Sequence, residues 1–487
     1  MDLYRAEQVR RLDATAIETF GIPGMTLMER AGRAAWELLR KVMPGTGRIA
    51  VVCGAGNNAG DGYVVARLAA EAGLGVRLVA MKPPEQLSGD ALTAARAWLE
   101  PGNSVESWSG GGFQDADLIV DALLGTGLDR EVTGAFRDVI DAVNASGRPV
   151  LALDIPSGLH ADSGNVMGAA VKATHTMTFI GMKQGMVTGD GPEFCGQLHF
   201  NDLAVPDGVY EEFPAACRLI TYNTQKQLLG RRPRNAHKGH YGHVLVVGGD
   251  YGFAGAVRMA GEAAARCGAG LTSIATRSEH AFNIAASRPE LMARGVGGAT
   301  DVAALLNAST VVAVGPGLGR SDWSLALFGR VLDSGRPLVV DADGLNLLAQ
   351  EPEQRDSWIL TPHPGEAARL LGVTAAEIQA DRFAAARELQ QQYGGIIALK
   401  GSGTLIAAPG GIRICGDGNP GMASGGMGDV LTGVIAGLLA QGLEASAAAS
   451  LGVCLHAAAA DRAAASGGER GLLATDLYPA LRTLVNP

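Results

Sequence analysis

The sequence predicts an α/β protein made of two three-layer α/β/α domains, each with a parallel sheet between two layers of helices. Short runs of β-branched and other apolar residues recur along the chain, and most of them end in a glycine-rich loop. Alanine-rich helical stretches separate these runs. Continuous apolar strands that alternate with helices are typical of a parallel sheet covered on both faces.

The strands can be placed from these runs. In the first half they are predicted at Ile49–Cys53, Val76–Ala80, Leu118–Asp121, Val150–Asp154 and Met177–Ile180, with a helix over Gly62–Ala72. The pattern lapses between about Val205 and His240, where prolines and charges replace it, so the domain boundary is predicted near residues 210–222. Strands then resume at Val244–Val247, Leu271–Ala275, Val311–Val314, Leu338–Val340, Ile359–Leu360 and Ile396–Leu399, and the last 60 residues are predicted as alanine-rich helix.

Composition excludes several classes of protein. The 487 residues include 69 glycines, about twice the usual share of ~7%, but these have no three-residue period, which excludes a collagen-like chain. Hydrophobic residues make up 47% and charged residues 18%, a balance that excludes disorder. The net charge of −9 argues against a nucleic-acid partner, although backbone N–H groups can still bind a phosphate.

The cysteines and the N-terminus predict a cytoplasmic protein without a membrane partner. The six cysteines are scattered, and the closest two are 22 residues apart, so no CxxC motif for a metal or a disulfide is present. Scattered buried thiols suit a reducing compartment. The N-terminus lacks the apolar core of a secretory signal, and the longest uncharged alanine-rich run, 445–460, is too short to cross a bilayer.

The first motif with chemical meaning is CGAGNNAGDG, residues 53–62, directly after a strand. Glycines at such a turn let the backbone approach a phosphate, and the following helix offers its positive N-terminus. The spacing is G-x-G-x-x-x-G, one residue longer than the dinucleotide fingerprint, and the second strand ends in Met81–Pro84 without the usual acid. The motif therefore indicates phosphate binding but disfavours a dehydrogenase. The alternative is a tight turn without a ligand.

Two further loops, DALLGTGLDRE (121–131) and LDIPSGL (153–159), also follow strands. Ligands of open α/β sheets bind at the carboxyl ends of strands, so the three loops are predicted to form one site. Asn58, Asp121 and Ser157 offer hard oxygen ligands for a cation. Asp154 is a candidate acid or base, with Lys183 as its partner. The alternative for each aspartate is a carboxylate that caps a helix or braces a loop.

These motifs, together with the opening segment AEQVRRLDATAIETFGIPGMTLMERAG, resemble the YjeF-type NAD(P)HX epimerases over residues 1–212. Ala59 stands where that family more often has glycine. The resemblance implies a Rossmann-like fold and the interconversion of the R and S epimers of hydrated NADH or NADPH. It implies Asp154 as the catalytic acid or base, and a K⁺ ion held by Asn58, Asp121 and Ser157. The implied substrate contacts are Asn57, Asn58, Ala59, Gly60, Asp61, Gly125, Thr126, Gly127, Leu128, Asp129, Arg130, Glu131 and Asp154.

The second half carries a sharper signal, NPGMASGGMGDVLTG, in which Gly425, Gly426 and Gly428 precede a long apolar helix predicted to begin near Asp429. Backbone N–H groups at such a helix start form an anion hole that suits a transferring phosphoryl group. Asp429 at its mouth can accept a proton from an attacking hydroxyl. The alternative is an aspartate that merely stabilises the helix dipole.

Other strand-end loops of this half carry polar residues: VGGDYGFAGA, GPGLGR, DADGLN, TPHPGE and LKGSGT. Lys400 and the residues after it are candidates for gripping the phosphates of a nucleotide. No GxxxxGK[ST] motif occurs, which disfavours a P-loop NTPase. His363 lies between two prolines and is therefore held in a rigid loop, although a single loop histidine is often exposed and without a role.

Residues 222–487 resemble the ribokinase-like superfamily, and within it the ADP/ATP-dependent NAD(P)HX dehydratases, through these loops and the segment HKGHYGHVLVVGGDYGFAGA. The resemblance implies that the catalytic Asp429, with Ala256, Gly319 and His363, contacts the hydrated substrate. It implies that Lys400, Gly401, Ser402, Gly403, Thr404 and Gly428 contact the adenine nucleotide. Fused two-domain members of bacterial type use ADP, so ADP with Mg²⁺ is expected.

The expected protein is thus a bifunctional repair enzyme whose partners are NADHX or NADPHX and ADP. A ribokinase-like small-molecule kinase with a nucleotide-binding N-terminal sensor remains the main alternative, since it would share the fold and release a stable phosphorylated product. The order of preference between NADHX and NADPHX, and whether the chain forms a homo-oligomer, are left open by the sequence.

Overall fold

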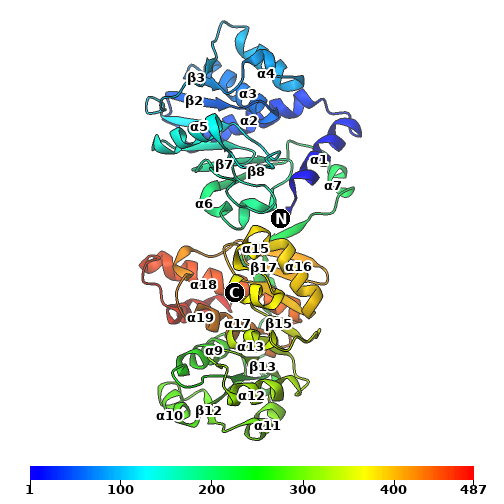
Figure 1. The fold of residues 1–487 in the computed structure, drawn as a ribbon, viewed down its shortest axis with the longest axis vertical. Coiled ribbons are helices and arrows are strands. Elements are labelled where there is room, and N and C mark those ends of the chain that lie inside the picture. The colour runs from blue at the N-terminus through cyan, green and yellow to red at the C-terminus, as the bar shows by residue number, and fades with distance from the viewer. Residues whose placement is uncertain (487) are drawn as a thin grey trace. The chain divides into compact units, whose positions relative to one another are not determined.

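The computed structural model describes residues 1–486, and the chain divides into two compact units, Met1–Cys217 and the described chain from Arg218 onward (Figure 1). Among these residues, no helix is both long enough and apolar enough to cross a membrane. Each unit has its own sheet of mainly parallel strands with helices packed on it.

The strands of the first unit are β1 (Asp2–Leu3), β2 (Arg48–Cys53), β3 (Gly75–Ala80), β4 (Glu106–Ser107), β5 (Leu118–Ala122), β6 (Val150–Leu153), β7 (His175–Phe179) and β8 (Gln197–Asn201), and β9 (Cys217–Ile220) begins at its last residue. Its helices are α1 (Ala6–Glu18), α2 (Gly24–Val42), α3 (Asn57–Glu71), η1 (Pro84–Gln86), α4 (Gly89–Leu99), α5 (Gly134–Ala145), η2 (Gln184–Val187), α6 (Gly191–Cys195) and α7 (Gly208–Glu211).

The sheet of the first unit has the strand order β4-β3-β2-β5-β6-β7-β8, and every neighbouring pair is parallel. The chain starts at β2, moves outward to β3 and β4, and then crosses back to β5. The strand order therefore reverses between β2 and β5, as in Rossmann-like domains, where the ligand crevice lies at this reversal. The predicted Rossmann-like fold is confirmed.

Hydrophobic cores cover both faces of this sheet, which confirms the three-layer arrangement. Alternate residues of β2 point to opposite faces: Ile49 and Val51 belong to the core under α2, α3 and α4, whereas Ala50 and Val52 belong to the core under α5. All four side chains are 1% exposed or less. Because the helices occupy both faces, only the strand ends remain open to a ligand.

Helix α3 begins at Asn57, five residues before its predicted start at Gly62. Gly62 is the last residue of the predicted glycine-rich loop, but it lies inside the helix. A Cβ atom on it would come within 2.6 Å of the Cβ of Ala122 on the sheet. This glycine therefore serves close packing of helix on strand. The glycine that the turn requires is Gly54, whose Cβ would lie 1.8 Å from the backbone oxygen of Leu123.

The strands of the second unit are β10 (His243–Val247), β11 (Leu271–Thr276), β12 (Met292–Gly295), β13 (Val311–Val314), β14 (Leu338–Val340), β15 (Trp358–Leu360), β16 (Ile396–Leu399), β17 (Leu405–Ala408) and β18 (Gly411–Cys415). Its longer helices are α9 (Ala254–Arg266), α10 (Ser278–Ser287), α11 (Ala299–Ala308), α12 (Asp322–Leu332), α13 (Ala342–Leu348), α14 (Pro364–Leu371), α16 (Arg382–Tyr393), α17 (Met427–Ala440), α18 (Ala445–Gly467) and α19 (Leu477–Leu484). The short helices are α8 (Tyr222–Gln225), η3 (Lys226–Leu228), η4 (Lys238–Tyr241), α15 (Ala375–Ala380), η5 (Pro420–Met422) and η6 (Ala474–Asp476).

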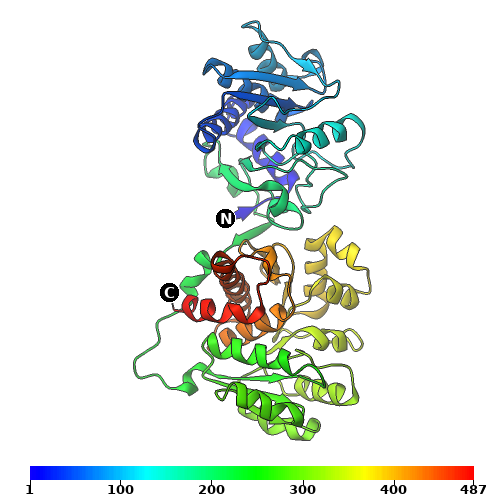
Figure 2. The ribbon, with the colours of Figure 1, turned by 90° about the vertical axis from the view of Figure 1, so that its left-hand side faces the viewer.

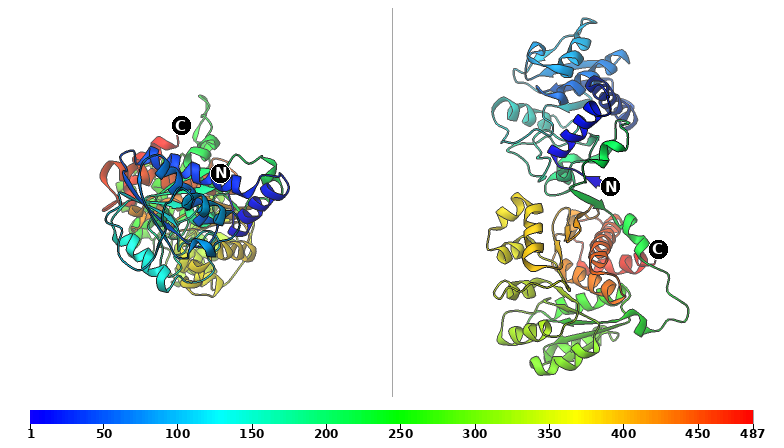
Figure 3. Two further views of the ribbon diagram at one scale, coloured as in Figure 1. Left: turned by 90° about the horizontal axis from the view of Figure 1, so that it is seen from above. Right: turned by 90° about the vertical axis from the view of Figure 1, so that its right-hand side faces the viewer.

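In the second unit the strands run in the order β9-β18-β17-β16-β15-β14-β13-β10-β11-β12. The strands from β16 to β12 are parallel, and the order reverses between β10 and β13. Strands β16, β17 and β18 pair antiparallel, an edge that the sequence pattern did not predict. The predicted α/β class and parallel central sheet are confirmed (Figures 2 and 3).

Both faces of the central strands are also covered in the second unit. On β10, Val244 and Val246 belong to the core beneath α9, α17 and α18, while Leu245 and Val247 point to the other face and are equally buried. The predicted continuous helix over the last 60 residues is wrong in detail, because glycines at 442, 468 and 471 with positive φ separate α17, α18 and α19. Figure 2 shows α18 and α19 side by side.

Candidate active sites

In the first unit, the glycine-rich loop of residues 53–62 lies at the strand reversal, between β2 and α3. Asn57 is exposed in the first turn of α3, whereas Asn58 and Gly60 are buried. Gly60 has no room for a side chain, since a Cβ would meet the sulfur of Met28 at 2.5 Å. Ala59 is fully buried in the hydrophobic core, so its methyl group fills the core and does not narrow the loop.

The predicted cation ligands meet beside this turn. Asp121 is the fourth residue of β5 and is fully buried; its Oδ1 accepts a hydrogen bond from Ser157 Oγ at 2.6 Å, and its Oδ2 accepts one from Ser157 N at 2.8 Å. Asn58 joins them from α3, because its Nδ2 donates to the backbone oxygen of Leu124 at 3.0 Å. The same Leu124 donates its N–H to Ser157 Oγ at 2.8 Å. Three loops are thereby tied into one cluster.

The oxygen atoms of this cluster fit a monovalent cation. The Oδ1 atom of Asn58 is buried and has no hydrogen-bond partner, which is costly for an amide oxygen unless an ion satisfies it. Burial raises the pKa of Asp121 to about 6, although hydrogen bonds from Ser157 and Leu123 partly oppose this rise. An orphaned oxygen next to a buried carboxylate is the kind of oxygen donor set that K⁺ accepts.

The second feature of this unit is an ion pair between Asp154 and Lys183. Asp154 follows β6 in a left-handed conformation (φ +65°), which is strained for a residue with a side chain. The Lys183 ammonium donates to Asp154 Oδ1, and it also donates to Thr178 Oγ1 at 2.9 Å and to the Phe179 oxygen at 3.4 Å. The Lys183 side chain is 0% exposed and that of Asp154 is 18% exposed. The pairing that the sequence suggested is therefore confirmed.

Two more carboxylates share this electrostatic environment. Asp61 lies on α3, and burial, followed by the charges of Asp154 and Asp13, raises its pKa well above the usual range. Asp13 lies on α1, and burial, followed by the charge of Asp154, raises its pKa to about 6. Asp13 was missed from the sequence, because it lies on an amphipathic helix of the opening segment, 141 residues before Asp154, and not at the end of a strand.

The loop after β5 joins the cluster only at its start. Gly125 lies against Asn58 and Asp154, with a Cβ position 3.5 Å from the Cβ of Asn58. Thr126 and Leu128 are half-buried, while Gly127 is exposed. The remaining members of the predicted substrate set in this loop, Asp129, Arg130 and Glu131, are exposed.

In the second unit, a buried ion pair lies where β14 and β16 end. Lys400 follows β16, and its ammonium donates to Asp341 Oδ1 at 2.7 Å. Thr432 of α17 donates from its hydroxyl to Asp341 Oδ2 at 2.8 Å. The side chain of Asp341 is 2% exposed and that of Lys400 is 19% exposed. The predicted phosphate-gripping lysine thus points at protein carboxylates, since Glu366 Oε2 also lies 3.7 Å from its ammonium.

Asp429 lies in the first turn of α17 beside this pair. Burial, followed by the charge of Asp341, raises the pKa of Asp429 to about 7, and Lys400 partly opposes the rise. Glu366 is another buried acid here, and burial raises its pKa. Three carboxylates, those of Asp341, Glu366 and Asp429, therefore share the single ammonium group of Lys400. A surplus of negative oxygen ligands at a strand end fits Mg²⁺ together with nucleotide phosphates.

Of the three glycines in this motif, Gly425 and Gly426 precede α17, whereas Gly428 lies in its first turn. The helix begins at Met427, two residues before its predicted start, and Gly426 adopts a left-handed conformation (φ +89°). A Cβ on Gly428 would lie 3.4 Å from both Asp341 Oδ2 and the Lys400 ammonium. The open helix start therefore faces the ion pair, and its first N–H groups have no partner within the helix.

His363 precedes α14 and caps it. Its Nδ1 accepts from Gly365 N at 3.0 Å, and its Nε2 lies 3.4 Å from Glu366 Oε1. Burial, followed by the charges of Lys400 and Arg369, lowers the pKa of His363, which favours the neutral ring. Because Nδ1 accepts, the ring proton is on Nε2, on the side of the acidic cluster.

Ala256 and Gly319 lie at the strand reversal between β10 and β13. Gly319 has a positive φ of 72° and donates its N–H to Asp343 Oδ2 at 2.9 Å. Asp343 is one of the charges that raise the pKa of Asp429, which links this crevice to the acidic cluster. Ala256, in the first turn of α9, lies against Gly317, which belongs to the same loop as Gly319. The structure therefore brings the predicted substrate contacts of this unit to one edge of its sheet.

The turn of residues 400–404 connects β16 to β17, and a buried arginine holds its backbone. Arg382 of α16 is 2% exposed and donates to the backbone oxygens of Leu399 and Lys400 at 3.3 Å each, and also to that of Ser402. Burial lowers the pKa of Arg382 to about 10. Gly401 and Ser402 are exposed in this turn.

Sequence reasoning missed Asp341, Glu366 and Thr432 as site residues. Asp341 and Glu366 lie in the loops DADGLN and TPHPGE, so their position at strand ends was the signal that could have found them. Thr432 gave no such signal, because it is one polar residue in an apolar helix. Its role depends on the hydrogen bond to Asp341 across 91 residues.

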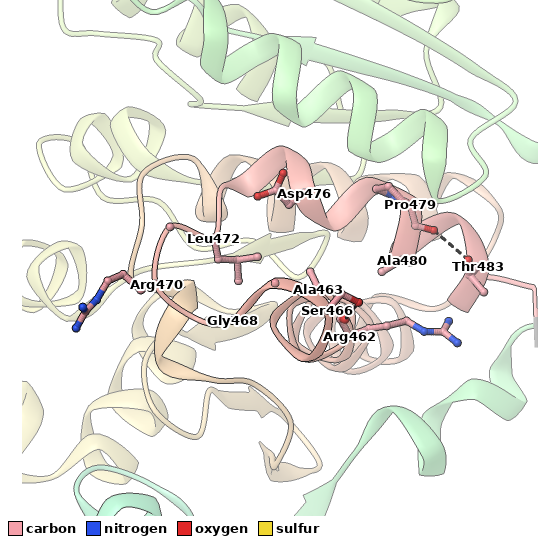
Figure 4. Close-up of a pocket in the computed structure, with 12 residues that line it drawn as sticks. Arg462, Ala463, Ser466, Gly468, Arg470, Leu472, Asp476, Pro479, Ala480 and Thr483 are labelled. Atoms are coloured by element: carbon pink, nitrogen blue, oxygen red, sulfur yellow. Dashed lines mark hydrogen bonds between the residues drawn. The ribbon is translucent and has the colours of Figure 1, made fainter.

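A pocket of about 540 Å³ lies elsewhere in the second unit, between α18 and α19 (Figure 4). Glycine, alanine, leucine and proline residues form much of its wall, and Arg462 and Arg470 extend in opposite directions from it. None of the residues predicted for the active sites lines this pocket.

The family of the chain follows from comparison with known proteins. Residues 244–482 match the family model described as NAD(P)H-hydrate dehydratase, and residues 24–185 match the model described as YjeF-related protein N-terminus. The bifunctional NAD(P)H-hydrate repair enzyme Nnr of Coxiella burnetii is 51% identical over 486 residues, which cover 100% of this chain and 99% of that protein. The chain belongs to the bifunctional NAD(P)H-hydrate repair enzymes.

Other members of the family and solved structures agree. The bifunctional NAD(P)H-hydrate repair enzyme Nnr of Escherichia coli is 44% identical, with 100% of this chain and 94% of that protein covered. A crystal structure of an ADP/ATP-dependent NAD(P)H-hydrate dehydratase from Bacillus subtilis, co-crystallised with ATP/Mg²⁺, is 32% identical. It covers 55% of this chain and 97% of its own, with a TM-score of 0.51.

A ribokinase-like superfamily protein from Enterococcus faecalis is 29% identical, with a TM-score of 0.52 over 56% of this chain and 96% of its own. The ribokinase-like fold expected for the C-terminal half is therefore confirmed. The protein is an enzyme of NAD(P)H-hydrate repair that carries an N-terminal YjeF-type epimerase domain and a C-terminal NAD(P)H-hydrate dehydratase domain.

Proposed function

We propose that the two reactions of NAD(P)H-hydrate repair are divided between the two sites, with the epimerase in residues 1–212 and the ADP-dependent dehydratase in residues 222–487. Spontaneous hydration gives both epimers of the nicotinamide hydrate, while the dehydratase consumes the S epimer. An epimerase on the same chain returns the R epimer to repair. The observation that carries the proposal is Asp429, a carboxylate of raised pKa at a glycine-rich helix start.

In the dehydratase, Asp429 acts as the general base. A base is most effective when its pKa lies near the working pH, and burial together with Asp341 raises the pKa of Asp429 to about 7. Asp429 accepts the proton of the C6 hydroxyl as the hydroxyl oxygen attacks the β-phosphorus of ADP. The N–H groups of the helix start at 425–428 stabilise the charge on the transferring group.

The reaction balances in two further steps. The bond between the β-phosphorus and its bridging oxygen breaks, so AMP leaves and the substrate carries a C6 phosphate. The lone pair of the ring nitrogen then expels inorganic phosphate, and loss of a proton from C5 restores NAD(P)H. Phosphorylation is needed because hydroxide is a poor leaving group, whereas phosphate is a good one.

Two groups of residues support this step without touching the reacting atoms. Asp341 and Thr432 hold the Lys400 ammonium at the edge of the helix start, where it neutralises phosphate charge. The turn of residues 401–404 binds the rest of the nucleotide above Arg382. Mg²⁺, held by the nucleotide phosphates and the carboxylate surplus, would supply further charge neutralisation.

In the epimerase, Asp154 is the base and Lys183 positions it. Lys183 is 0% exposed and donates to three acceptors, so it cannot reach a ligand, whereas Asp154 is partly exposed at the end of β6. Asp61 supports the opposite role, because burial and the charge of Asp154 raise its pKa and favour its protonated form. Neighbouring acids whose environments differ in this way are suited to act as base and acid. We assign Asp61 as the group that protonates the C6 hydroxyl, which leaves as water when the lone pair of the ring nitrogen forms an iminium ion. Asp154 accepts the proton of the water that then adds to C6 from the opposite face.

K⁺ would be held by Asn58, Asp121 and Ser157. The ion would satisfy the orphaned Asn58 oxygen and join α3 to the ends of β5 and β6. Bound there, it supplies positive charge near the nucleotide phosphates. The six cysteines are buried and form no disulfide among residues 1–486, which supports a location in a reducing compartment such as the cytoplasm.

The test is recovery of NADH absorbance from a mixture of R and S NADHX, with Mg²⁺, K⁺ and either ADP or ATP. The wild type is expected to recover the full amount with ADP. Asp429→Asn should block recovery from both epimers. Asp154→Asn should leave a fast phase from the S epimer, followed by a slow phase limited by spontaneous epimerisation.

Two exposed aspartates give matched controls. Asp322 lies in the first turn of α12, and Asp138 lies on α5. Asp322→Asn and Asp138→Asn should both recover NADH as the wild type does. A wild type that recovers no NADH with either nucleotide, or that accumulates a stable phosphorylated product, would contradict the proposal and favour a kinase.

A further inference from the structure

A cluster of two thiols and one carboxylate lies apart from both proposed active sites, in the second unit. Cys415 is the last residue of β18, Asp417 follows it in the next loop, and Cys454 faces them from α18. One ligand atom of each residue lies within 4.8 Å of those of the other two. Cys415 and Cys454 are 39 residues apart in sequence, so only the fold brings them together.

The distances within the cluster suit a tetrahedral metal site. With metal–sulfur bonds of about 2.3 Å and metal–oxygen bonds of about 2.0–2.2 Å, ligand atoms around zinc lie about 3.5–3.8 Å from one another. Starting from separations of at most 4.8 Å, the three atoms of the cluster would have to approach by no more than about 1.0–1.3 Å, which side-chain rotation can supply. Three protein ligands leave the fourth position to water.

The charge around the cluster also favours a cation. The Asp417 carboxylate lies within electrostatic reach of Asp461, and its Oδ2 accepts a hydrogen bond from Tyr222 N at 2.5 Å. Within residues 1–486, neither Asp417 nor Asp461 forms a salt bridge. Two carboxylates without a cationic partner are unfavourable next to buried thiols unless a positive ion compensates them.

The surroundings hold the cluster in place. Asp461 lies two helical turns after Cys454 on α18, and it accepts from Gly418 N at 2.9 Å and from Asn419 Nδ2 at 2.8 Å. It thereby fixes the loop that carries Asp417 against the helix. The backbone N–H of Cys415 donates to the Thr404 oxygen at 3.0 Å, so the cluster is one hydrogen bond away from the proposed nucleotide turn.

We propose that Cys415, Asp417 and Cys454 bind one Zn²⁺ ion. The ion ties the end of β18 and the loop after it to α18, and so braces the turn that ends at Thr404. Thiolates select zinc over Mg²⁺ or Ca²⁺, which prefer oxygen ligands, and this site is therefore distinct in chemistry from the proposed Mg²⁺ and K⁺ sites.

The first experiment measures metal content in the purified full chain. Chelator-treated, reduced protein is incubated with Zn²⁺ and desalted, and zinc per chain is counted by mass spectrometry. The wild type is expected to keep one zinc per chain, and Cys454→Ser and Asp417→Asn should lose it. Cys267→Ser is the matched control, because Cys267 is another buried free thiol of this unit that is not part of the cluster.

A second measurement identifies the ligands. Co²⁺ in place of Zn²⁺ should give a thiolate-to-metal charge-transfer band in the near ultraviolet for the wild type and for Cys267→Ser, but not for Cys454→Ser. Zinc held at the surface histidines His237 and His240, whose rings are 3.8 Å apart, would give no such band. Zinc at 100-fold above its Kd should raise the Tm by about 5–10 °C in proteins with the site.

Protection of the thiols keeps the test decisive if a variant fails to fold. In the wild type, Zn²⁺ should slow alkylation of Cys415 and Cys454 and leave Cys267 unaffected. The proposal is overturned if the wild type keeps no more zinc than Cys454→Ser, if zinc protects neither thiol, or if mass spectrometry of the native protein finds a Cys415–Cys454 disulfide.

Discussion

The pH dependence of the dehydratase follows from the surroundings of Asp429. This carboxylate must be ionised to accept the proton of the C6 hydroxyl, and burial together with Asp341 raises its pKa to about 7. The acid limb of the pH profile is therefore expected near neutrality, about three units above that of an ordinary aspartate. Lys400 is the nearest group that opposes this rise.

The size of the effect can be worked out from that pKa. A base with a pKa of about 7 is about 90% ionised at pH 8 and about 10% ionised at pH 6, so kcat/KM should fall about 10-fold between these values. Asp429→Asn removes the base and should lower kcat/KM by about 10²- to 10⁴-fold. The remaining kcat/KM of this variant should no longer fall between pH 8 and pH 6.

The assay is the initial rate of NADH recovery from purified S-NADHX at subsaturating ADP with Mg²⁺, from pH 5.5 to 8.5 at constant ionic strength. Subsaturating conditions are used because kcat/KM then reports the pKa of the free enzyme. The rate without enzyme is subtracted at each pH, because the hydrate also reacts spontaneously. Asp322→Asn, in the first turn of another helix, should follow the wild-type profile.

Two results would refute the reasoning. A wild-type profile that is flat from pH 6 to 8 would mean that no group of pKa about 7 must be ionised. An acid limb that persists unchanged in Asp429→Asn would assign the limb to another residue, such as Glu366, whose pKa burial also raises.

Further predictions concern both units. Asp429→Asn should raise the Tm of its unit at pH 8 but not at pH 4: a raised carboxylate pKa in the folded state destabilises the fold increasingly from about pH 4 to about pH 7, and Asn removes that cost. Asp121→Asn should weaken K⁺ activation of the epimerase by about 10- to 100-fold, measured by titration with KCl at constant ionic strength. Lys183→Met should abolish epimerisation and destabilise the first unit by about 3–5 kcal/mol, because it leaves buried carboxylates without their cation. Gly54→Ala should destabilise the same unit by about 3 kcal/mol or more in urea unfolding, since its Cβ would meet the Leu123 oxygen at 1.8 Å.

Exposed residues of the first unit provide the controls for these changes. Lys172→Met, which removes an exposed ion pair with Glu193, should leave epimerisation and stability nearly unchanged. Asp138→Asn should leave the K⁺ titration unchanged. A Lys183→Met protein with wild-type epimerase activity would exclude the proposed positioning role, and K⁺ activation that survives Asp121→Asn would exclude the proposed ion site.

The sequence predicted those parts of the sites that local chemistry dictates. A glycine turn after a strand, an aspartate at a strand end and an aspartate at a glycine-rich helix start are visible in the chain, so Asp121, Asp154 and Asp429 could be proposed as site residues from the sequence alone. Parallel strands bring such ends to one edge, which is why separate motifs could be expected to meet.

What the sequence left out depends on contacts between distant segments. Asp13 lies on a helix whose sequence shows only amphipathic spacing, and its raised pKa comes from burial and the charge of Asp154. Thr432 is important only through Asp341, which lies 91 residues earlier. Cys415 and Cys454 have no motif spacing, because the mixed sheet edge and α18 that bring them together were not predicted in detail.

The burial of Lys183 has a consequence for the lifetime of the enzyme. Amines and thiols are the groups that sugars, aldehydes and oxidants attack first, and attack requires access from water. The Lys183 amine is 0% exposed, and all six thiols are buried. The amine that positions Asp154 is therefore shielded from reagents that can reach exposed amines such as that of Lys172.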